Sequence, residues 1–177
     1  MKKTVKQTLA AVVAVLAGIF SIGAGMGLYS VTFIPLWMPL AAAAVIALAV
    51  MPALLPRWQR LAGGIPAWAA GIGHLAVTGG VCFALILGAN YFGASEPHEV
   101  AATVVGKEKK KHTRYRRAGR RNYVPAGDYY TWELVLELEG GRRYNKPVSA
   151  GRYRTVRMGS HTTVNVARGL FGFDVVK

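Results

Sequence analysis

The stretch IPAWAAGIGHLAVTGGVCFALILGANYF, residues 65–92, contains no charged side chain. The hydrocarbon core of a bilayer is about 30 Å thick, so roughly 20 apolar residues in a helix are enough to cross it. The stretch therefore predicts a membrane-spanning helix. The chain before it has the same character, and beyond the lysines near its start its only charges are Arg57 and Arg60. Its length predicts two further spans, at 8–28 and 31–55.

A polar region follows the spans. All eight acidic residues and 17 of the 22 Lys and Arg residues lie within 95–177. The sequence thus divides into a three-helix transmembrane region, 1–94, and a soluble domain, 95–177. The lysines at the start also resemble those of a signal peptide, but the apolar run is longer than the usual 7–15 residues and no clear cleavage site follows it. We expect the first helix to remain uncleaved.

Basic residues in short loops indicate which side of the membrane each loop occupies, because Lys and Arg accumulate on the cytoplasmic side. Three lysines precede the first span, the first loop has none, and Arg57 and Arg60 lie in the second. The N-terminus is therefore expected in the cytoplasm and the C-terminal domain outside it. The cations that begin at Lys107 oppose this orientation, although long domains translocate despite their charge. We expect a multi-pass protein of the bacterial inner membrane.

Small residues spaced four apart allow membrane helices to approach closely. The pattern occurs three times, at Gly23 and Gly27, at Ala69 and Gly73, and at Gly80 and Ala84. It fits either packing among the three helices of one chain or docking of another membrane subunit or a second copy. The spacing alone does not choose between them.

Two polar side chains, His74 and Asn90, interrupt the third span. An ionisable residue inside a membrane is a functional candidate by default. A single histidine without an intramembrane carboxylate makes neither a proton relay nor a metal site, so a structural hydrogen bond is the favoured interpretation. Cys82, the only cysteine, has no disulfide partner in its own chain.

The C-terminal domain shows the two-residue alternation of β-strands from about residue 99 onward. Its clearest strand places one set of side chains on a single face: Tyr130, Trp132, Leu134, Leu136 and Leu138. Gly140 and Gly141 predict a two-residue hairpin turn after it. Further strands are expected at 100–105, 162–166 and 170–176. About five short strands without a helical period predict a small all-β antiparallel barrel or sandwich.

A basic arm, residues 107–121, separates the first two of these strands. It carries nine cations and one acid. The cations are Lys107, Lys109, Lys110, Lys111, Arg114, Arg116, Arg117, Arg120 and Arg121. Such a segment forms an exposed loop or hairpin that is simply solvated, or that binds anionic lipid or glycan. Nucleic acid is a third interpretation, but an extracytoplasmic domain would not meet it.

The sequence indicates no catalytic residues, no metal site and no cofactor. The histidines of the tail, His98, His112 and His161, have no spacing typical of a zinc set or of a nucleophile and its base. The acidic cluster at 96–99 is typical of a solvated linker. These observations argue against an enzyme.

The segment YRTVRMGSHTTVNV, residues 153–166, resembles a pattern of uncharacterised bacterial membrane-protein families, in which a strand with a leading glycine closes a small β domain after N-terminal helices. The resemblance covers about residues 99–176 and implies no catalytic residues. A second resemblance, in architecture only, is to membrane proteins of the NfeD type. Fold analogy of this kind does not establish function.

We therefore expect a non-enzymatic integral membrane protein that displays a basic β domain as an envelope binding or interaction module. The alternative is an accessory subunit of a membrane transport or secretion complex. A stable membrane partner would favour the alternative.

Overall fold

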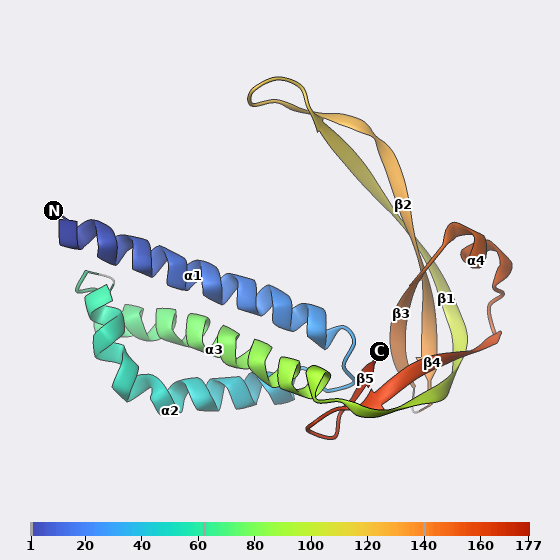
Figure 1. The fold of residues 1–177 in the computed structure, drawn as a ribbon, viewed down its shortest axis with the longest axis horizontal. Helices are drawn as coiled ribbons and strands as arrows, with labels where there is room; N and C mark the ends of the chain where they lie inside the picture. Colours follow the sequence, from blue (N-terminus) through green and yellow to red (C-terminus); the bar gives the residue numbers. More distant parts are fainter. Residues whose placement is uncertain (1, 62, 140) are drawn as a thin grey trace. The chain divides into compact units, whose positions relative to one another are not determined.

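The computed structural model describes residues 2–61, 63–139 and 141–177, and it divides the chain into two compact units (Figure 1). The helical unit comprises Met1–Pro97 together with Val166–Lys177, and the sheet unit comprises His98–Asn165. The last twelve residues thus belong with the helices and not with the rest of the C-terminal domain. The sequence did not predict this division.

Three long helices make up most of the helical unit: α1, Lys2–Tyr29; α2, Trp37–Leu61; and α3, Ala67–Phe92. The segments Leu9–Tyr29, Trp37–Leu61 and Ala67–Phe92, of 21, 25 and 26 residues, are long and apolar enough to cross a membrane. The prediction of a three-span membrane protein is confirmed in this respect.

The second span is displaced from its expected position at 31–55. Prolines Pro52 and Pro56 lie inside α2 instead of ending it, so Arg57 and Arg60 fall in its last turns and not in a loop. Neither proline has an N–H to donate to the carbonyl one turn earlier, and Figure 1 shows α2 bending in this region. A proline-containing helix survives in a membrane when neighbouring groups take up the freed carbonyls.

Helix α3 packs against both α1 and α2, which hardly touch each other. Glycines permit the close approach of α1. A Cβ added to Gly18 would lie 3.0 Å from the backbone of Val77, one added to Gly25 would lie 2.5 Å from the ring of Phe83, and one added to Gly80 would lie 2.8 Å from Ile22. The Gly80 and Ala84 pair of the sequence pattern therefore lies at the α1–α3 contact.

The other two small-residue pairs, Gly23 with Gly27 and Ala69 with Gly73, do not lie at the tight contacts between helices. An added Cβ at Gly23, Gly27 or Gly73 would meet nothing within 4 Å, and Ala69 is only half-buried. The glycines that pack most tightly are Gly18 and Gly25, seven residues apart, which is two helical turns. Gly23 and Gly27 thus lie away from the residues of α1 that pack on α3.

The connection between α1 and α2 is a short extended segment that pairs with the C-terminal strand. Thr32 bridges Val175 in antiparallel fashion, the N–H of Phe33 donates to the carbonyl of Asp174 at 2.8 Å, and that of Val176 donates to Val31 at 2.8 Å. The strand β5, Asp174–Val176, is thereby tied to the helices.

The remaining elements are β1, Ser95–Arg117; β2, Tyr123–Leu138; β3, Arg142–Val148; a short helix α4, Ala150–Thr155; and β4, His161–Arg168. The five strands form one sheet in the order β3-β2-β1-β4-β5. In the described residues β3 and β5 are its two ends and do not pair, so the sheet is open. The expected barrel or sandwich is corrected to a single open antiparallel sheet.

The core of the sheet unit lies where the sequence placed it. Leu134, Leu136 and Leu138 of β2 are buried and share one face with Val104 of β1. The turn after β2 differs from the prediction. Leu138 pairs with Arg142, which leaves three residues between the strands, and Gly141 adopts a positive φ of 74°. Of the two glycines, Gly140 lies outside the described residues.

Candidate functional site

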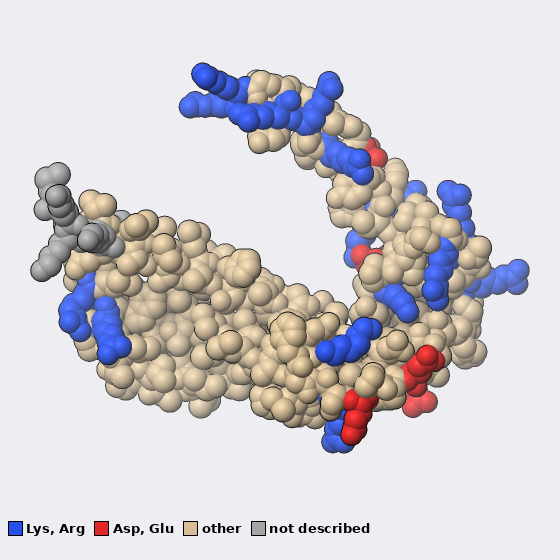
Figure 2. All heavy atoms as spheres, in the orientation of Figure 1, with Lys and Arg blue, Asp and Glu red and all other residues tan. Residues whose placement is uncertain are grey.

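The basic arm forms a two-stranded antiparallel hairpin. The register runs from Ala102 opposite Leu138 to Arg117 opposite Tyr123, and the N–H of Ala118 donates to Asn122 at 2.7 Å to close the end. Figure 2 shows Lys and Arg side chains spreading from the outer end of the hairpin. Of the two forms left open by the sequence, loop or hairpin, the structure has the hairpin.

The cations of the hairpin separate by type along its length. We call residues 107–113 and 128–133 the hairpin base, and residues 114–127 the hairpin tip. The base holds four lysines and three acids, and the tip holds five arginines and no acid. Nine cations and three acids leave six positive charges uncompensated, and most of this excess lies at the tip.

The base lysines are engaged by neighbouring carboxylates. Lys110 lies 2.7 Å from Glu133 and 3.5 Å from Glu108, and Lys111 lies 2.8 Å from Asp128. The hydrogen bond to Glu133 raises the pKa of Lys110, and the one to Asp128 raises the pKa of Lys111. The pKa of Asp128 is lowered in turn by hydrogen bonds from Lys111 and Thr113. These cations already have partners.

The other base lysines rest on aromatic rings. The Nζ atom of Lys109 lies 4.0 Å from the ring centre of Tyr130 and 4.9 Å from that of Trp132. Lys107 lies 4.5 Å from the ring centre of Tyr153 in α4 and donates to the carbonyl of Val156 at 2.9 Å. Cation–π contacts of this kind contribute about 0.5–1 kcal/mol each at exposed positions. The base lysines thus belong to the fold of the hairpin.

The tip arginines are mostly unengaged. Arg117 donates to the carbonyls of Gly119 and Arg120, which holds the turn, and Arg114 stacks over Tyr129 at 5.0 Å. The other three have no carboxylate partner within the described part of the chain and are exposed. They are Arg116, Arg120 and Arg121.

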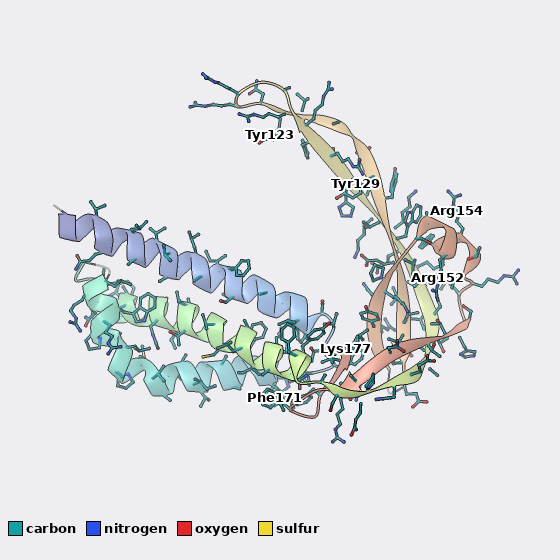
Figure 3. All side chains as sticks on the ribbon, viewed as in Figure 1. Tyr123, Tyr129, Arg152, Arg154, Phe171 and Lys177 are labelled. Atoms are coloured by element: carbon teal, nitrogen blue, oxygen red, sulfur yellow. The ribbon has the colours of Figure 1, made fainter. Side chains whose placement is uncertain are left out.

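Exposed tyrosines accompany these arginines. Tyr115 is 65% exposed and Tyr123 is 67% exposed, and Figure 3 shows Tyr123 at the tip with Tyr129 nearer the base. A guanidinium presents a planar fork of donors that matches carboxylate and phosphate oxygens. The tip can therefore bind anionic groups without a pocket, and its tyrosines offer flat rings beside them.

Two of the tail histidines hydrogen-bond to threonines of neighbouring strands. His112 hydrogen-bonds with Thr131 at 2.9 Å and stacks on Tyr129, whereas His161 hydrogen-bonds with Thr103 at 3.2 Å. Among residues 2–61, 63–139 and 141–177, no three His, Cys, Asp or Glu side chains gather where they could hold a metal ion.

The two polar residues of α3 have structural partners. His74 is fully buried; its Nε2 donates to the carbonyl of Ala47 at 2.9 Å, and its Nδ1 accepts from Thr78 at 3.1 Å. Ala47 lies in α2 just before its proline-containing part, so the histidine ties α3 to α2 there. This agrees with the structural hydrogen bond expected from the sequence.

Asn90 ties the C-terminal segment to α3. Its Nδ2 donates to the carbonyl of Phe173 at 3.0 Å, and its Oδ1 accepts from the N–H of Phe171 at 3.0 Å. Gly169 lies so close that any added Cβ would overlap the amide group. Sequence reasoning singled out Asn90 as polar but missed this role, because its partner groups are backbone atoms about 80 residues away.

The separation of lysine from arginine is visible in the sequence, but its meaning depends on the strand register. Lys109 reaches Tyr130 and Trp132 only because β1 pairs with β2 in this register.

Comparison with protein-family models, with curated proteins and with solved structures finds no match to this chain. The site therefore rests on its own geometry, and the resemblance to bacterial membrane families stays a prediction.

Proposed function

We propose that this protein is a membrane-anchored binding module whose hairpin tip binds a surface rich in anionic groups, such as phosphate headgroups or the carboxylates of acidic glycans. The observation that carries the proposal is the contrast within the hairpin: the base lysines are paired or stacked, whereas Arg116, Arg120 and Arg121 have no carboxylate partner among the residues that the structure describes. Unpaired arginines are not needed for folding and are available to a partner.

The expected strength is substantial although no pocket is involved. Each Lys or Arg near an anionic surface contributes about 1 kcal/mol, so the five tip arginines together contribute on the order of 5 kcal/mol. The attraction is screened by salt within about 10 Å at 0.1 M ionic strength. Binding of this kind is broad in specificity and strongly dependent on salt.

The proposed membrane is the bacterial inner membrane, with the C-terminal domain on the extracytoplasmic side. Arg57 and Arg60 lie at the same end of the helical unit as the start of α1, where Figure 1 marks the N-terminus, and three spans follow from that end to the tail. Concentration of basic residues at this end favours a cytoplasmic location for it. Reporter fusions after Lys177 test the orientation, since a fusion active only in the cytoplasm would overturn it.

The binding experiment uses the full-length protein in neutral nanodiscs. Arg116→Gln, Arg120→Gln and Arg121→Gln combined should lower affinity for anionic vesicles or acidic glycans roughly 100-fold, taking about 1 kcal/mol per charge. The matched control removes three exposed arginines of the same unit outside the hairpin, Arg152, Arg154 and Arg157, of which Figure 3 labels two on α4.

The control variant should lose much less affinity at the same net charge. Equal losses in the two variants would mean that only total charge matters and that the tip is not the contact surface. Binding to vesicles but not to glycans, or the reverse, identifies the anionic partner. An unchanged melting temperature confirms that the tip variant is folded.

A second candidate function, an accessory subunit of a transport or secretion complex, is favoured by one observation. Gly23 and Gly27 lie exposed on α1 with nothing within 4 Å of an added Cβ, although this spacing suits close helix contact. Gly23→Leu with Gly27→Leu should release a stoichiometric partner during purification in mild detergent if this function holds.

A further inference from the structure

An apolar cavity of about 400 Å³ lies within the helical unit, between the start of α2, the end of α3 and the C-terminal turn. Its walls include Met38, Ala42 and Ile46 of α2, Ile86 and Leu87 of α3, and Phe171 and Phe173 of the turn. Pockets that hold small molecules occupy roughly 300–1,000 Å³. The cavity is thus large enough to accept a ligand.

The polar groups at the cavity are already satisfied by the chain itself. Asn90 is 2% exposed and uses its amide on Phe171 and Phe173, and Thr32 donates to the carbonyl of Leu28 at 2.8 Å. Each of these side-chain nitrogen and oxygen atoms already has a hydrogen-bond partner within the chain. The chemistry of the lining therefore selects a hydrocarbon occupant.

The open side of the cavity faces what surrounds the helices. Ile46 is 43% exposed and Phe171 is 52% exposed, and both lie on its wall. Since α2 and α3 are long and apolar enough to cross a membrane, an opening between them is open to lipid. Figure 3 places Phe171 on the turn beside these helices.

We propose that this cavity binds one acyl chain of a bilayer phospholipid, held between α2, α3 and the C-terminal turn. The inference is independent of the anion-binding function, because it concerns different residues and an uncharged part of the ligand. The Asn90 contacts keep Phe171 and Phe173 in place as one wall, so the C-terminal turn is part of the site.

The test measures lipid retained by the full-length protein after purification in mild detergent, by native mass spectrometry. Wild type should retain one phospholipid, identified by its mass. Ala42→Phe fills the cavity and should lower retention at least about tenfold, since overpacking costs about 1–3 kcal/mol. Ala44→Phe is the matched control: it changes an exposed alanine on the opposite side of α2, outside the lining, and should retain the lipid.

Ala42→Leu adds a smaller side chain to the cavity and should give an intermediate loss of lipid retention. This keeps the test decisive if the phenylalanine variant does not fold.

In a second measurement, a dioleoyl phospholipid added to delipidated protein should raise the melting temperature, whereas the deacylated headgroup compound should not. Equal retention in Ala42→Phe and Ala44→Phe overturns the proposal. Stabilisation by the headgroup compound alone also overturns it, and so does retention of a free fatty acid instead of a phospholipid. A dimer that Ala42→Phe dissociates and Ala44→Phe does not would overturn it as well, because the occupant would then be a second copy of the chain.

Discussion

The base and the tip of the hairpin carry similar numbers of cations but use them differently. At the base, lysines pair with Glu133 and Asp128 or lie over aromatic rings, so their charge contributes to the conformation of the two strands. At the tip, arginines extend from a closed turn, and none of them forms an ion pair with a carboxylate in the described residues. Charge density alone therefore does not distinguish cations that are already paired from cations that are available to a partner.

The largest expected effect tests whether the strands of the hairpin continue into a buried core. Leu136 is fully buried beside Leu134 and Leu138 in β2. Leu136→Asp buries an unpaired carboxylate and should destabilise the sheet unit by more than about 4 kcal/mol. Hydrogen exchange of the β2 backbone amides in the full-length protein, measured as a function of temperature, is a suitable measurement.

Tyr123→Asp is the control for this change. It introduces the same charge at the exposed tip and should move the melting temperature by little, about 0.5 kcal/mol or less. If the two substitutions lowered the melting temperature by similar amounts, the contrast between the buried core of the sheet unit and the exposed hairpin tip would be refuted.

The next largest effect is expected when a double variant of the tip is compared with a double variant of the base. Arg120→Gln with Arg121→Gln removes two tip cations, and Lys110→Gln with Lys111→Gln removes two base cations. The tip variant should lose more affinity for anionic vesicles, roughly tenfold or more, because its side chains are free to contact the surface. Vesicle sedimentation at low salt and at a few hundred millimolar salt measures this, and the difference should vanish at high salt.

The same two variants should rank in the opposite order for stability. The base variant leaves Glu133 and Asp128 without their cations, whereas the tip variant breaks no carboxylate contact in the described residues. Surface ion pairs are weak, so the loss of stability is expected to be small. A tip variant that is the less stable of the two would contradict the division of roles.

The helices and the main strand could be predicted because their signals are local. Long apolar runs require membrane spans, and alternation around Leu134, Leu136 and Leu138 requires a strand with one buried face. The end of α2 could not be predicted, because prolines usually end helices, whereas α2 continues past Pro52 and Pro56 while it packs against the neighbouring helix α3. Local sequence carries no information about such a neighbour.

The open sheet and the binding elements depend on contacts that are distant in sequence. The pairing of residues 31–33 with β5 joins segments more than 140 positions apart, and it leaves the C-terminal turn beside α3 instead of closing a barrel. For the hairpin, the sequence predicted all nine cations as one set. The strand register decides which of these cations have partners on β2. For the base lysines these partners include Tyr130, Trp132, Glu133 and Asp128, whereas the five arginines of the set lie at the tip.

The smallest expected effect concerns the ion pair nearest the boundary between base and tip. Hydrogen bonds from Lys111 and Thr113 lower the pKa of Asp128, and the bond to Asp128 raises the pKa of Lys111. A carboxyl whose pKa is lowered on folding stabilises the fold above its unfolded pKa of about 3.9, and this contribution is lost as pH falls through the folded value. A lysine whose pKa is raised contributes below about 10.4 and loses its contribution as pH rises through the folded value.

The pair should therefore hold this part of the hairpin throughout the neutral range and release it first in acid. Both side chains are substantially exposed, so solvent screening keeps the effect on overall stability small. Carbon-detected NMR of the Asp128 carboxyl should show titration below the usual aspartate range, and Asp128→Asn should return Lys111 toward its ordinary pKa. Ordinary titration of Asp128 would show that Lys111 is not bound to it, and Lys111 would then join the tip arginines as a cation available to anions.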